Sequence, residues 1–388
     1  MIKNIQYKKL GEICDFISGG TPSKSKNEYW KNGNIPWIKI SDFKEKYIKF
    51  SEEKITKIGL ENSSAKILKK GTILYTIFAS VGKVAILDIE ATTNQAIVGV
   101  NLKENNLVDK DFLYYFLCSI ENNIKRQARG VAQNNINISI LKNVCIPILP
   151  ISSQKNIVKT LMRLEDILEN FKQKKILINF LNKSLFTTMF GDIKTNDKNW
   201  KLFEIKEISN IITRGKTPKY ALSSNIFVIN QACIYWDKIK YENMKFHIED
   251  ENLLFLKNKD VLINSTGAGT LGRMNIIQNI IHEKFTIDSH VMLVRLKDEK
   301  TLPLYFINIF MNEKYQKDLL LKCVNGSTNQ IELSKEKFSK FKIPVPPIEL
   351  QNKFAERIEK ITKLSFEIEE AIKEAENLYN SLISKYFD

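Results

Sequence analysis

Residues 146–154 of this chain read IPILPISSQ, and residues 343–351 read IPVPPIELQ. Both prolines and the final glutamine of the first segment recur in the second, each 197 positions later. Each segment leads into a long run without Pro or Gly, in which apolar residues return every three to four positions. Because such self-similarity marks a chain built from related units, the sequence predicts a tandem duplication.

The similarity continues upstream in the same order in both copies, with a separation that drifts as insertions collect in loops. The matched pairs are Glu12-Ile13 with Glu207-Ile208, Gly20 with Gly215, Thr21-Pro22 with Thr217-Pro218, Thr72–Tyr75 with Asp260–Ile263, and Gly130 with Gly326. We therefore predict four segments: a first globular domain over 1–151, a long helix over 152–190, a second globular domain over 191–347, and a second long helix over 348–388.

Composition is that of a folded protein with a basic bias. Hydrophobic residues make up 43% and charged residues 27% of the 388 residues, and the net charge is +15. A basic pair of domains suits a polyanion such as DNA, because phosphate neutralisation supplies most of the sequence-independent affinity. A genome whose base composition favours Lys, Ile and Asn is the alternative explanation of the charge.

Cysteine usage and hydropathy bear on the compartment. The five cysteines are an odd number without a close pair, which predicts free thiols rather than a disulfide frame or a zinc knuckle. No apolar run approaches the roughly 18 residues that span a bilayer, and the first residues lack the apolar core of a secretory signal. We expect a cytoplasmic protein without a membrane anchor.

The two runs without Pro or Gly predict long helices, each roughly 50–55 Å long at about 1.5 Å per residue. Apolar residues repeat in heptads, as in a coiled coil, with Lys175 and Asn182 as polar interruptions in the first run. The residues that we expect in a helix–helix core are Leu161, Leu164, Leu168, Phe171, Ile178 and Leu185 in the first run, and Ile358, Ile361, Ile368, Ile372, Tyr379 and Leu382 in the second.

We expect these helices to pack on each other as an antiparallel coiled coil. The order domain–helix–domain–helix then places one domain at each end, related by a pseudo-twofold axis. Residues 151–190 carry a net charge of +4 and residues 349–388 a net charge of −3, which favours mutual pairing over self-pairing. In the alternative, the helices belong to separate cores or pair with another chain.

Each globular half reads as short β-branched and aromatic strands with a few helices, which predicts an α+β fold. The predicted strands are 35–40, 72–78, 83–87 and 96–102 in the first half and 227–230, 261–263, 273–277 and 290–296 in the second. Short apolar helices are predicted over 111–120 and 304–312, just before two polar loops rich in Asn and Gln.

This duplicated layout resembles the specificity subunit of type I restriction-modification systems, over nearly the whole chain. The segments that carry the resemblance are Gly19–Pro22, Lys70–Leu74, Val81–Lys83 and Gly130–Gln133 in the first copy, and Arg214–Pro218, Lys259–Leu262, Gly267–Arg273 and Gly326–Gln330 in the second, with the two proline segments quoted above. The first copy departs from the family at Leu149–Ser152, where the family has the double proline that Pro346-Pro347 retains.

The resemblance implies two tandem α/β target-recognition domains, each reading one part of a bipartite double-stranded DNA target. It implies that the helices set the spacing and dock two methyltransferase (modification) subunits, through which restriction subunits join. It also implies a non-catalytic subunit that binds no cofactor itself, with S-adenosylmethionine, ATP and Mg²⁺ on the partner subunits.

Motifs that would indicate an enzyme are weak in this chain. Residues 267–272 read GAGTLG and match a nucleotide-binding fingerprint, but a β-branched segment follows where a helix is required. We interpret this stretch as a tight β-turn. The three histidines form no close-spaced metal pattern. A self-sufficient DNA methyltransferase or nuclease stays as the enzyme alternative, and a coiled-coil scaffold without sequence specificity as the third.

Base readout needs groups that form two hydrogen bonds to one base: Arg or Lys donates to guanine, and Asn or Gln pairs a donor and an acceptor with adenine. The candidates in the polar loops are Gln133, Asn134 and Asn135 in the first half, and Asn325, Thr328, Asn329 and Gln330 in the second. The candidates for phosphate contacts, which position a domain without reading sequence, are Lys24, Lys26, Lys83, Arg214, Lys216, Lys219 and Arg273. In the alternative, the Asn and Gln residues only form turns.

Overall fold

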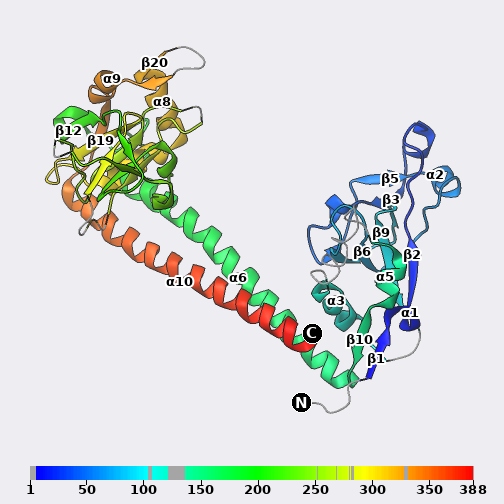
Figure 1. Ribbon diagram of the computed structural model, residues 1–388. Helices are drawn as coiled ribbons and strands as arrows, with labels where there is room; N and C mark the ends of the chain where they lie inside the picture. The colour runs from blue at the N-terminus through cyan, green and yellow to red at the C-terminus, as the bar shows by residue number, and fades with distance from the viewer. Residues whose placement is uncertain are drawn as a thin grey trace. The chain divides into compact units, whose positions relative to one another are not determined.

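The computed structural model describes residues 6–103, 107–120, 136–250, 252–267, 269–278, 280, 284–326 and 331–387. The chain divides into two compact units (Figure 1). Unit 1 comprises Met1–Lys172 and Glu370–Asp388, and unit 2 comprises Gln173–Glu369. The division runs through both long helices, α6 (Ile151–Phe190) and α10 (Ile348–Phe387), so each unit contains half of each helix.

The domain of unit 1 contains two packed sheets and short helices. Its central sheet has the strand order β2-β9-β6-β7-β4, and a second sheet has the order β5-β3-β8. The central strands are β2 (Cys14–Ser18), β9 (Ile97–Leu102), β6 (Ile73–Thr76), β7 (Val84–Leu87) and β4 (Tyr47–Ile48). The second sheet consists of β5 (Glu53–Ile55), β3 (Ile35–Ile38) and β8 (Thr92–Thr93). The helices are α1 (Leu10–Ile13), α2 (Lys57–Glu61), α3 (Lys110–Ser119) and α5 (Ile138–Asn143).

Unit 2 repeats this plan. Its central sheet has the order β12-β19-β16-β17, and its second sheet the order β13-β15-β14-β18. The central strands are β12 (Ser209–Arg214), β19 (Val291–Leu296), β16 (Val261–Asn264) and β17 (Met274–Ile276). The second sheet consists of β13 (Tyr220–Ala221), β15 (Lys245–His247), β14 (Ile226–Ile229) and β18 (Lys284–Ile287). The remaining elements are α7 (Pro303–Met311), α8 (Glu313–Cys323), α9 (Lys335–Ser339) and the hairpin of β20 (Val324–Asn325) with β21 (Glu332–Leu333).

Successive side chains of a strand point to opposite faces of its sheet, and in β6 and β16 of the central sheets the side chains on both faces are buried. In β16, Val261 and Ile263 join the core beneath the helices, whereas Leu262 joins the core shared with the second sheet. In β6, Tyr75 faces the helices and Leu74 faces the second sheet. Strands buried on both faces read as continuous apolar runs, which is why the sequence revealed them so clearly.

A two-stranded antiparallel ladder joins each domain to its long helix. In unit 1, β1 (Gln6–Lys9) pairs with β10 (Cys145–Ile148), which leads into α6. In unit 2, β11 (Lys201–Glu204) pairs with β22 (Lys342–Val345), which leads into α10. Each ladder therefore ties the first strand of a domain to the strand that precedes its helix.

The recurring glutamines lie at these junctions, and both side chains are fully buried. The Gln154 Oε1 accepts the Asp109 N–H at 2.8 Å, and its Nε2 donates to the carbonyls of Leu107 at 2.8 Å and Leu149 at 2.7 Å. This amide therefore fastens the start of α6 to the loop before α3.

Gln351 makes the same three bonds in unit 2. Its Oε1 accepts the Leu302 N–H at 2.9 Å, and its Nε2 donates to the carbonyls of Lys300 at 3.1 Å and Pro346 at 2.8 Å. The two glutamines that mark the repeat in the sequence thus perform one structural task twice.

The long helices pack on each other in antiparallel orientation within both units. In unit 1, near the start of α6, Glu165 accepts hydrogen bonds from Tyr379 of α10 at 3.1 Å and from Tyr115 of α3 at 2.6 Å. In unit 2, Phe186 and Phe190 near the end of α6 lie against Phe354 near the start of α10. The predicted α+β domains, each followed by a long helix, and the antiparallel coiled coil are confirmed.

The predicted core positions lie along this seam. The buried ones are Leu161, Leu164, Ile178, Ile358 and Ile368; the half-buried ones are Leu168, Phe171, Leu185, Ile361, Ile372, Tyr379 and Leu382. The polar Lys175 contributes an ion pair between the helices, since its Nζ lies 2.8 Å from the Glu369 carboxylate of α10 in unit 2. Within the described residues, no helix is long and apolar enough to cross a membrane.

We expect Gln154→Ala and Gln351→Ala each to lower the free energy of unfolding by about 2–5 kcal/mol, because each leaves a buried N–H and two carbonyls without partners. Urea denaturation measures the change. Lys155→Ala and Asn352→Ala alter the exposed neighbouring positions and should cost less than about 0.5 kcal/mol. Equal effects for the glutamines and their neighbours would contradict this assignment.

Candidate nucleic-acid interface

One edge of each central sheet gathers the loops that the sequence singled out. In unit 2, β12 and β16 both run antiparallel to β19. The carboxyl ends of β12 and β16, at Arg214 and Asn264, therefore lie on the same edge as the start of β19 at Val291. Unit 1 has the same arrangement for β2, β6 and β9. We call this the loop edge of each central sheet.

Hydrogen bonds at the loop edge show that the predicted pairing of Gly20 with Gly215 is wrong by one residue. The Gly215 N–H donates to the Val291 carbonyl at 3.1 Å, and the Gly19 N–H donates to the Ile97 carbonyl at 3.1 Å. Gly19, rather than Gly20, is therefore the counterpart of Gly215. A Cβ at either position would lie about 2 Å from a backbone oxygen, 2.0 Å for Gly19 and 2.1 Å for Gly215, so only glycine fits.

Lys83 and Arg273, two of the predicted phosphate contacts, occupy equivalent positions in the two central sheets. The Thr76 N–H donates to the Lys83 carbonyl at 3.0 Å, and the Asn264 N–H donates to the Arg273 carbonyl at 2.8 Å. Lys83 is exposed. Arg273 is half-buried, with its guanidinium 5.1 Å from the centre of the Tyr235 ring. Both basic side chains occupy the turn that joins two central strands.

The glycine-rich stretch is that turn in unit 2. It connects the antiparallel strands β16 and β17, so the chain continues into a strand, as the sequence predicted, and not into a helix whose N-terminus could hold a phosphate. Gly267 and Gly272 have φ of +98° and +79°. In the first copy, Gly82 has φ of +99° at the equivalent turn.

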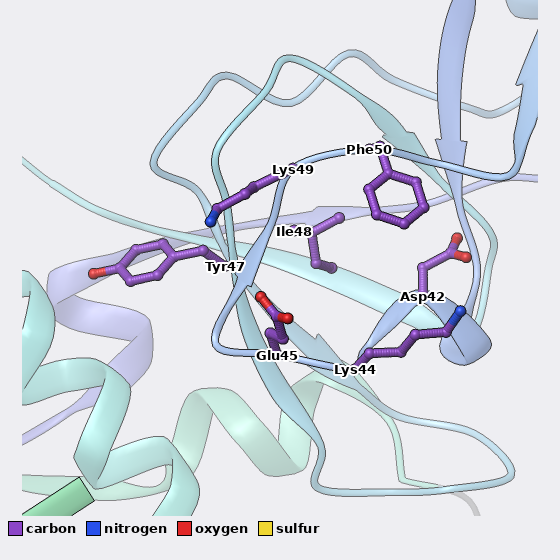
Figure 2. Close-up of a pocket in the computed structure, with 7 residues that line it drawn as sticks. All are labelled: Asp42, Lys44, Glu45, Tyr47, Ile48, Lys49 and Phe50. Atoms are coloured by element: carbon purple, nitrogen blue, oxygen red, sulfur yellow. The ribbon is translucent and has the colours of Figure 1, made fainter. Parts of the chain in front are cut away.

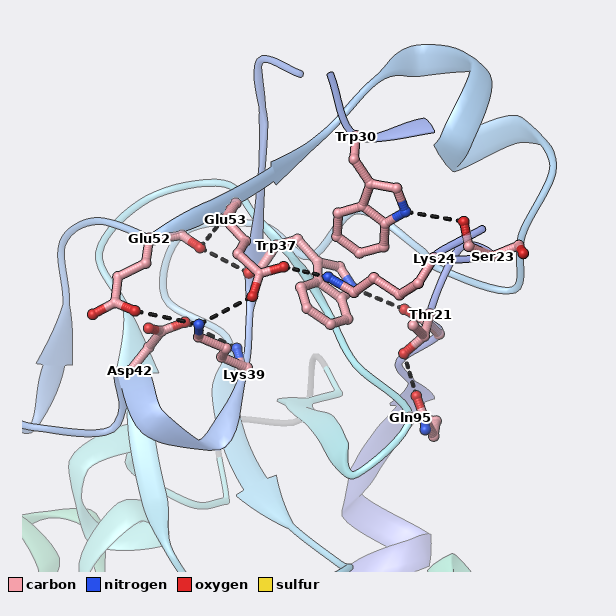
Figure 3. Close-up of polar contacts among 12 residues, drawn as sticks. Thr21, Ser23, Lys24, Trp30, Trp37, Lys39, Asp42, Glu52, Glu53 and Gln95 are labelled. Carbon is pink, nitrogen blue, oxygen red and sulfur yellow. Dashed lines mark hydrogen bonds and ion pairs between the residues drawn. The ribbon is translucent and has the colours of Figure 1, made fainter. Parts of the chain in front are cut away.

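In unit 1, Lys24 is held within the domain (Figure 3). Its ammonium forms an ion pair with Glu53 and lies 3.4 Å from the centre of the Trp30 ring. The hydrogen bond from Lys24 holds the pKa of the Glu53 carboxyl below its usual range. Lys39 contacts the same carboxylate at 3.0 Å. A phosphate would have to compete with Glu53 for Lys24.

Tryptophans shape the loop that carries these lysines (Figure 3). The indole N–H of Trp30 donates to the Ser23 carbonyl at 3.0 Å, and that of Trp37 donates to the Gly20 carbonyl at 2.9 Å. Trp37 is buried. Lys26 is exposed, and its Nζ donates to the Tyr29 hydroxyl at 2.9 Å. The aromatic side chains therefore fix the loop and leave the two lysines at its surface.

The basic candidates of unit 2 divide into exposed and engaged side chains. Lys216 and Lys219 are exposed. Arg214 is half-buried, pairs with the Glu332 carboxylate, and donates to the Leu333 carbonyl at 2.5 Å. Arg214 thus braces the β20–β21 hairpin against the end of β12.

The predicted base-reading loops can be located only by their flanks. Gln133, Asn134, Asn135, Thr328, Asn329 and Gln330 lie outside the described residues. Asn325 is described, is exposed, and faces Glu332 in the β20–β21 hairpin. Described residues that follow the two loops bond to the loop edge: the Ile136 N–H donates to the Ile77 carbonyl at 3.0 Å, and the Leu333 N–H donates to the Ser265 carbonyl at 2.8 Å.

Three polar side chains of this edge are not among the candidates that the sequence predicted: Gln231, Thr266 and His290. His290 is exposed and directly precedes β19. Its backbone N–H donates to the Asp288 carboxylate at 2.9 Å, and burial raises the pKa of that carboxyl. No motif links the three residues in the sequence, because they come from three separate elements.

A separate hollow of about 310 Å³ lies at the β4 edge of unit 1 (Figure 2). The segment 42–50 lines it by itself. Phe50 and Tyr47 are 67% and 39% exposed there. Because this hollow belongs to one continuous segment beyond the loop edge, it contributes nothing to the candidate interface.

Within the described residues, no cluster of three or more His, Cys, Asp or Glu side chains could hold a metal ion. The thiols of Cys14, Cys233 and Cys323 are buried. Burial raises the pKa of Cys14 to about 12 and that of Cys233 and Cys323 to about 11, so these thiols are protonated and poor nucleophiles at neutral pH.

Both duplicated domains carry basic side chains at the loop edge of the central sheet, which suits an anionic partner such as nucleic acid. The family model described as "Type I restriction modification DNA specificity domain" matches the chain twice, over residues 2–179 and 197–376. The chain belongs to this family. It is the DNA-recognition component of a restriction-modification system and not its catalyst.

Named relatives and solved structures agree with this assignment. The chain is 25% identical over 383 residues to the Type I restriction enzyme MjaIX specificity subunit of Methanocaldococcus jannaschii, covering 91% of this chain and 85% of the relative. It is 34% identical over 169 residues to the EcoR124I/EcoR124II specificity subunit of Escherichia coli, covering 42% and 41% of the two chains. These relatives give no support to a self-sufficient methyltransferase, a nuclease or a scaffold without specificity.

The fold is shared with solved structures at low sequence identity. A type I restriction-modification S subunit from M. genitalium is 17% identical with a TM-score of 0.55, covering 100% of this chain and 98% of that one. A chain from a structure of type I restriction-modification complex assembly is 16% identical with a TM-score of 0.63, covering 99% and 98%.

We expect Lys216→Ala to weaken binding to all DNA sequences alike and to reduce the slope of log K against log salt by about 0.9, the value for one phosphate contact. Lys24→Ala should change the slope less, because Glu53 already neutralises its ammonium. Fluorescence anisotropy at several salt concentrations measures the slope. Lys257→Ala, an exposed change just before β16 at the opposite edge of the sheet, is the control and should leave the slope unchanged.

Proposed function

We propose that each domain reads one part of a bipartite double-stranded DNA target and that the two long helices set the distance between the parts. The observation that carries this proposal is the repetition of the loop edge and of the glutamine junction in both units. Two domains with the same edge and the same attachment to a helix are suited to two separated groups of bases. Major-groove sites about 34 Å apart lie one helical turn from each other, and a helix of 40 residues measures about 60 Å.

The helices would also dock two methyltransferase subunits, through which restriction subunits join. Apolar side chains on the outer surface of the helices in unit 2 support this part of the proposal. Ile176, Leu177, Phe180 and Leu181 of α6 are between 48% and 67% exposed, and Phe366 of α10 is 63% exposed. Large exposed apolar groups gathered on one helix mark protein interaction sites.

The chemistry of the assembled complex would reside in the partners. S-adenosylmethionine, ATP and Mg²⁺ would bind to the methyltransferase and restriction subunits, and this chain would supply DNA recognition alone. We expect it to act in the cytoplasm, where the DNA and the partner subunits are available.

The experiment that tests the proposal maps methylated adenines across the genome with and without this gene. We expect one split motif to lose its methylation in the deletion strain and to regain it on complementation. A motif of continuous bases, or no change in any motif, would overturn the bipartite reading. Methylation by the purified chain without partner subunits would instead support the enzyme alternative.

We expect Leu177→Asp with Phe180→Asp to abolish association with the methyltransferase subunit, because both charges fall on side chains that are 65% and 67% exposed and would be buried in the assembly. Size-exclusion chromatography of the co-expressed subunits measures assembly. The exposed Leu222, in the second domain and 101% exposed, provides the control as Leu222→Asp. Normal assembly of the double variant would place the docking surface elsewhere.

A further inference from the structure

Three polar side chains meet at the loop edge of unit 2, in a cluster formed by Gln231, Thr266 and His290. Gln231 begins the 3-10 helix η4 (Gln231–Cys233), Thr266 follows β16, and His290 precedes β19. The Thr266 hydroxyl donates to the Gln231 Oε1 at 3.2 Å and lies 2.9 Å from the His290 Nδ1. Gln231 and Thr266 are half-buried, and His290 is exposed.

The directions of the hydrogen bonds within this cluster determine which donors and acceptors remain free for a ligand. A threonine hydroxyl has one proton, and here that proton goes to Gln231, so Thr266 Oγ1 accepts from the Nδ1–H of His290. In the uncharged form of an imidazole whose Nδ1 carries the proton, Nε2 has a lone pair and can accept a hydrogen bond. Among the described residues, the Gln231 Nε2 has no protein acceptor, and its Oε1 keeps a second lone pair. The cluster thus offers an amide donor and acceptor beside an imidazole acceptor.

The backbone is shaped around the Gln231 amide. A Cβ on Gly267, which has φ of +98°, would lie 2.8 Å from the Gln231 Oε1, so the turn leaves room for this side chain. The Nδ2 of Asn264, a fully buried residue, donates to the Gln231 carbonyl at 3.0 Å. Next in the turn, Gly269 faces open space, with nothing within 4 Å of an added Cβ. The backbone of Gln231 is therefore held in place, and Gly267 leaves room for its half-buried side chain.

Basic side chains flank the cluster. Arg273 and Lys240 both lie over the Tyr235 ring, with the guanidinium carbon 5.1 Å and the Nζ 4.3 Å from its centre. The Asn275 Nδ2 donates to the Tyr235 carbonyl at 2.7 Å and fixes that segment. In DNA, phosphates border the base edges. Cations beside an amide donor–acceptor pair therefore suit a site in which the cations contact phosphates and the amide contacts a base.

From this placement we infer that Gln231 is a specificity-determining residue that reads an adenine in the half-site of the second domain, oriented by Thr266 and supported by His290. The glutamine amide pairs with adenine through its donor to N7 and its acceptor from N6. The Nε2 of His290 accepts an amino proton of the adjacent base. This inference rests on the proposed function and deepens it by naming a base and a residue.

The test uses the complete complex of this chain with its own methyltransferase subunit. The complex methylates a plasmid library in which the two halves of the target are randomised in turn, and sequencing of methylated adenines gives the preference at each position. We expect Gln231→Ala to reduce discrimination at one position of one half-site about tenfold or more. Thr266→Val should weaken discrimination at the same position.

A conservative variant separates reading from a structural role. Gln231→Glu keeps the acceptor for Thr266 but removes the donor to adenine N7, and carboxylates accept from the cytosine amino group. We expect the preferred base at that position to change from adenine towards cytosine, which the loss of a merely structural contact would not produce. Gln278→Ala is the matched control, since Gln278 is exposed and follows β17 at the opposite edge of the sheet.

The possible outcomes distinguish failure of the proposed function from failure of the role inferred for Gln231. A wild-type complex without any split preference would defeat the proposed function itself. A wild-type complex that reads a split target while both Gln231 variants keep its preference would overturn only this inference. An equal loss of methylation on all sequences, or failure of the Gln231→Ala complex to assemble while the Gln278→Ala complex assembles, would assign Gln231 a structural role and also overturn it.

Discussion

The buried amide at the start of each long helix is the contact on which both halves of this protein depend. One carboxamide supplies one acceptor and two donors, and Gln154 and Gln351 each use all three on backbone groups of two neighbouring segments. A glutamate would place a charged acceptor against two carbonyls, and a shorter asparagine would fall about one carbon–carbon bond short. The glutamine therefore fixes the direction in which each helix leaves its own domain.

The loop edge depends on this junction through the register of the central sheet. The strand that precedes each long helix pairs with the first strand of the domain. That first strand leads through a short helix, α1 or the 3-10 helix η3 (Ile205–Ile208), into the central sheet. The N–H groups of Ile136 and Leu333 fasten the ends of the polar loops to the same sheet. The described ends of the polar loops are thus tied by backbone hydrogen bonds to a rigid sheet.

The sequence predicted the elements better than it predicted the site. Central strands such as 261–264 are buried on both faces and read as uninterrupted apolar runs, and heptads over 40 residues leave little choice but a long helix. The pairing of Gly20 with Gly215 was wrong by one residue. The Thr-Pro pairs are 196 positions apart, a separation that matches Gly19 with Gly215, and the bond of Gly19 to Ile97 confirms this match. The cluster of Gln231, Thr266 and His290 could not be predicted, since its contacts join residues 35 and 24 positions apart through the strand order.

Two basic side chains at the loop edge are engaged in ion pairs within their own domains. Lys24 is paired with Glu53, and Arg214 with Glu332, so a phosphate that approaches either group must displace a carboxylate. Such an exchange returns little free energy, because the ion pair that is broken resembles the one that is formed. Exposed lysines such as Lys216 retain the full gain of counterion release. A domain that holds part of its positive charge in internal pairs therefore binds arbitrary DNA weakly, and base contacts decide a larger share of its preference.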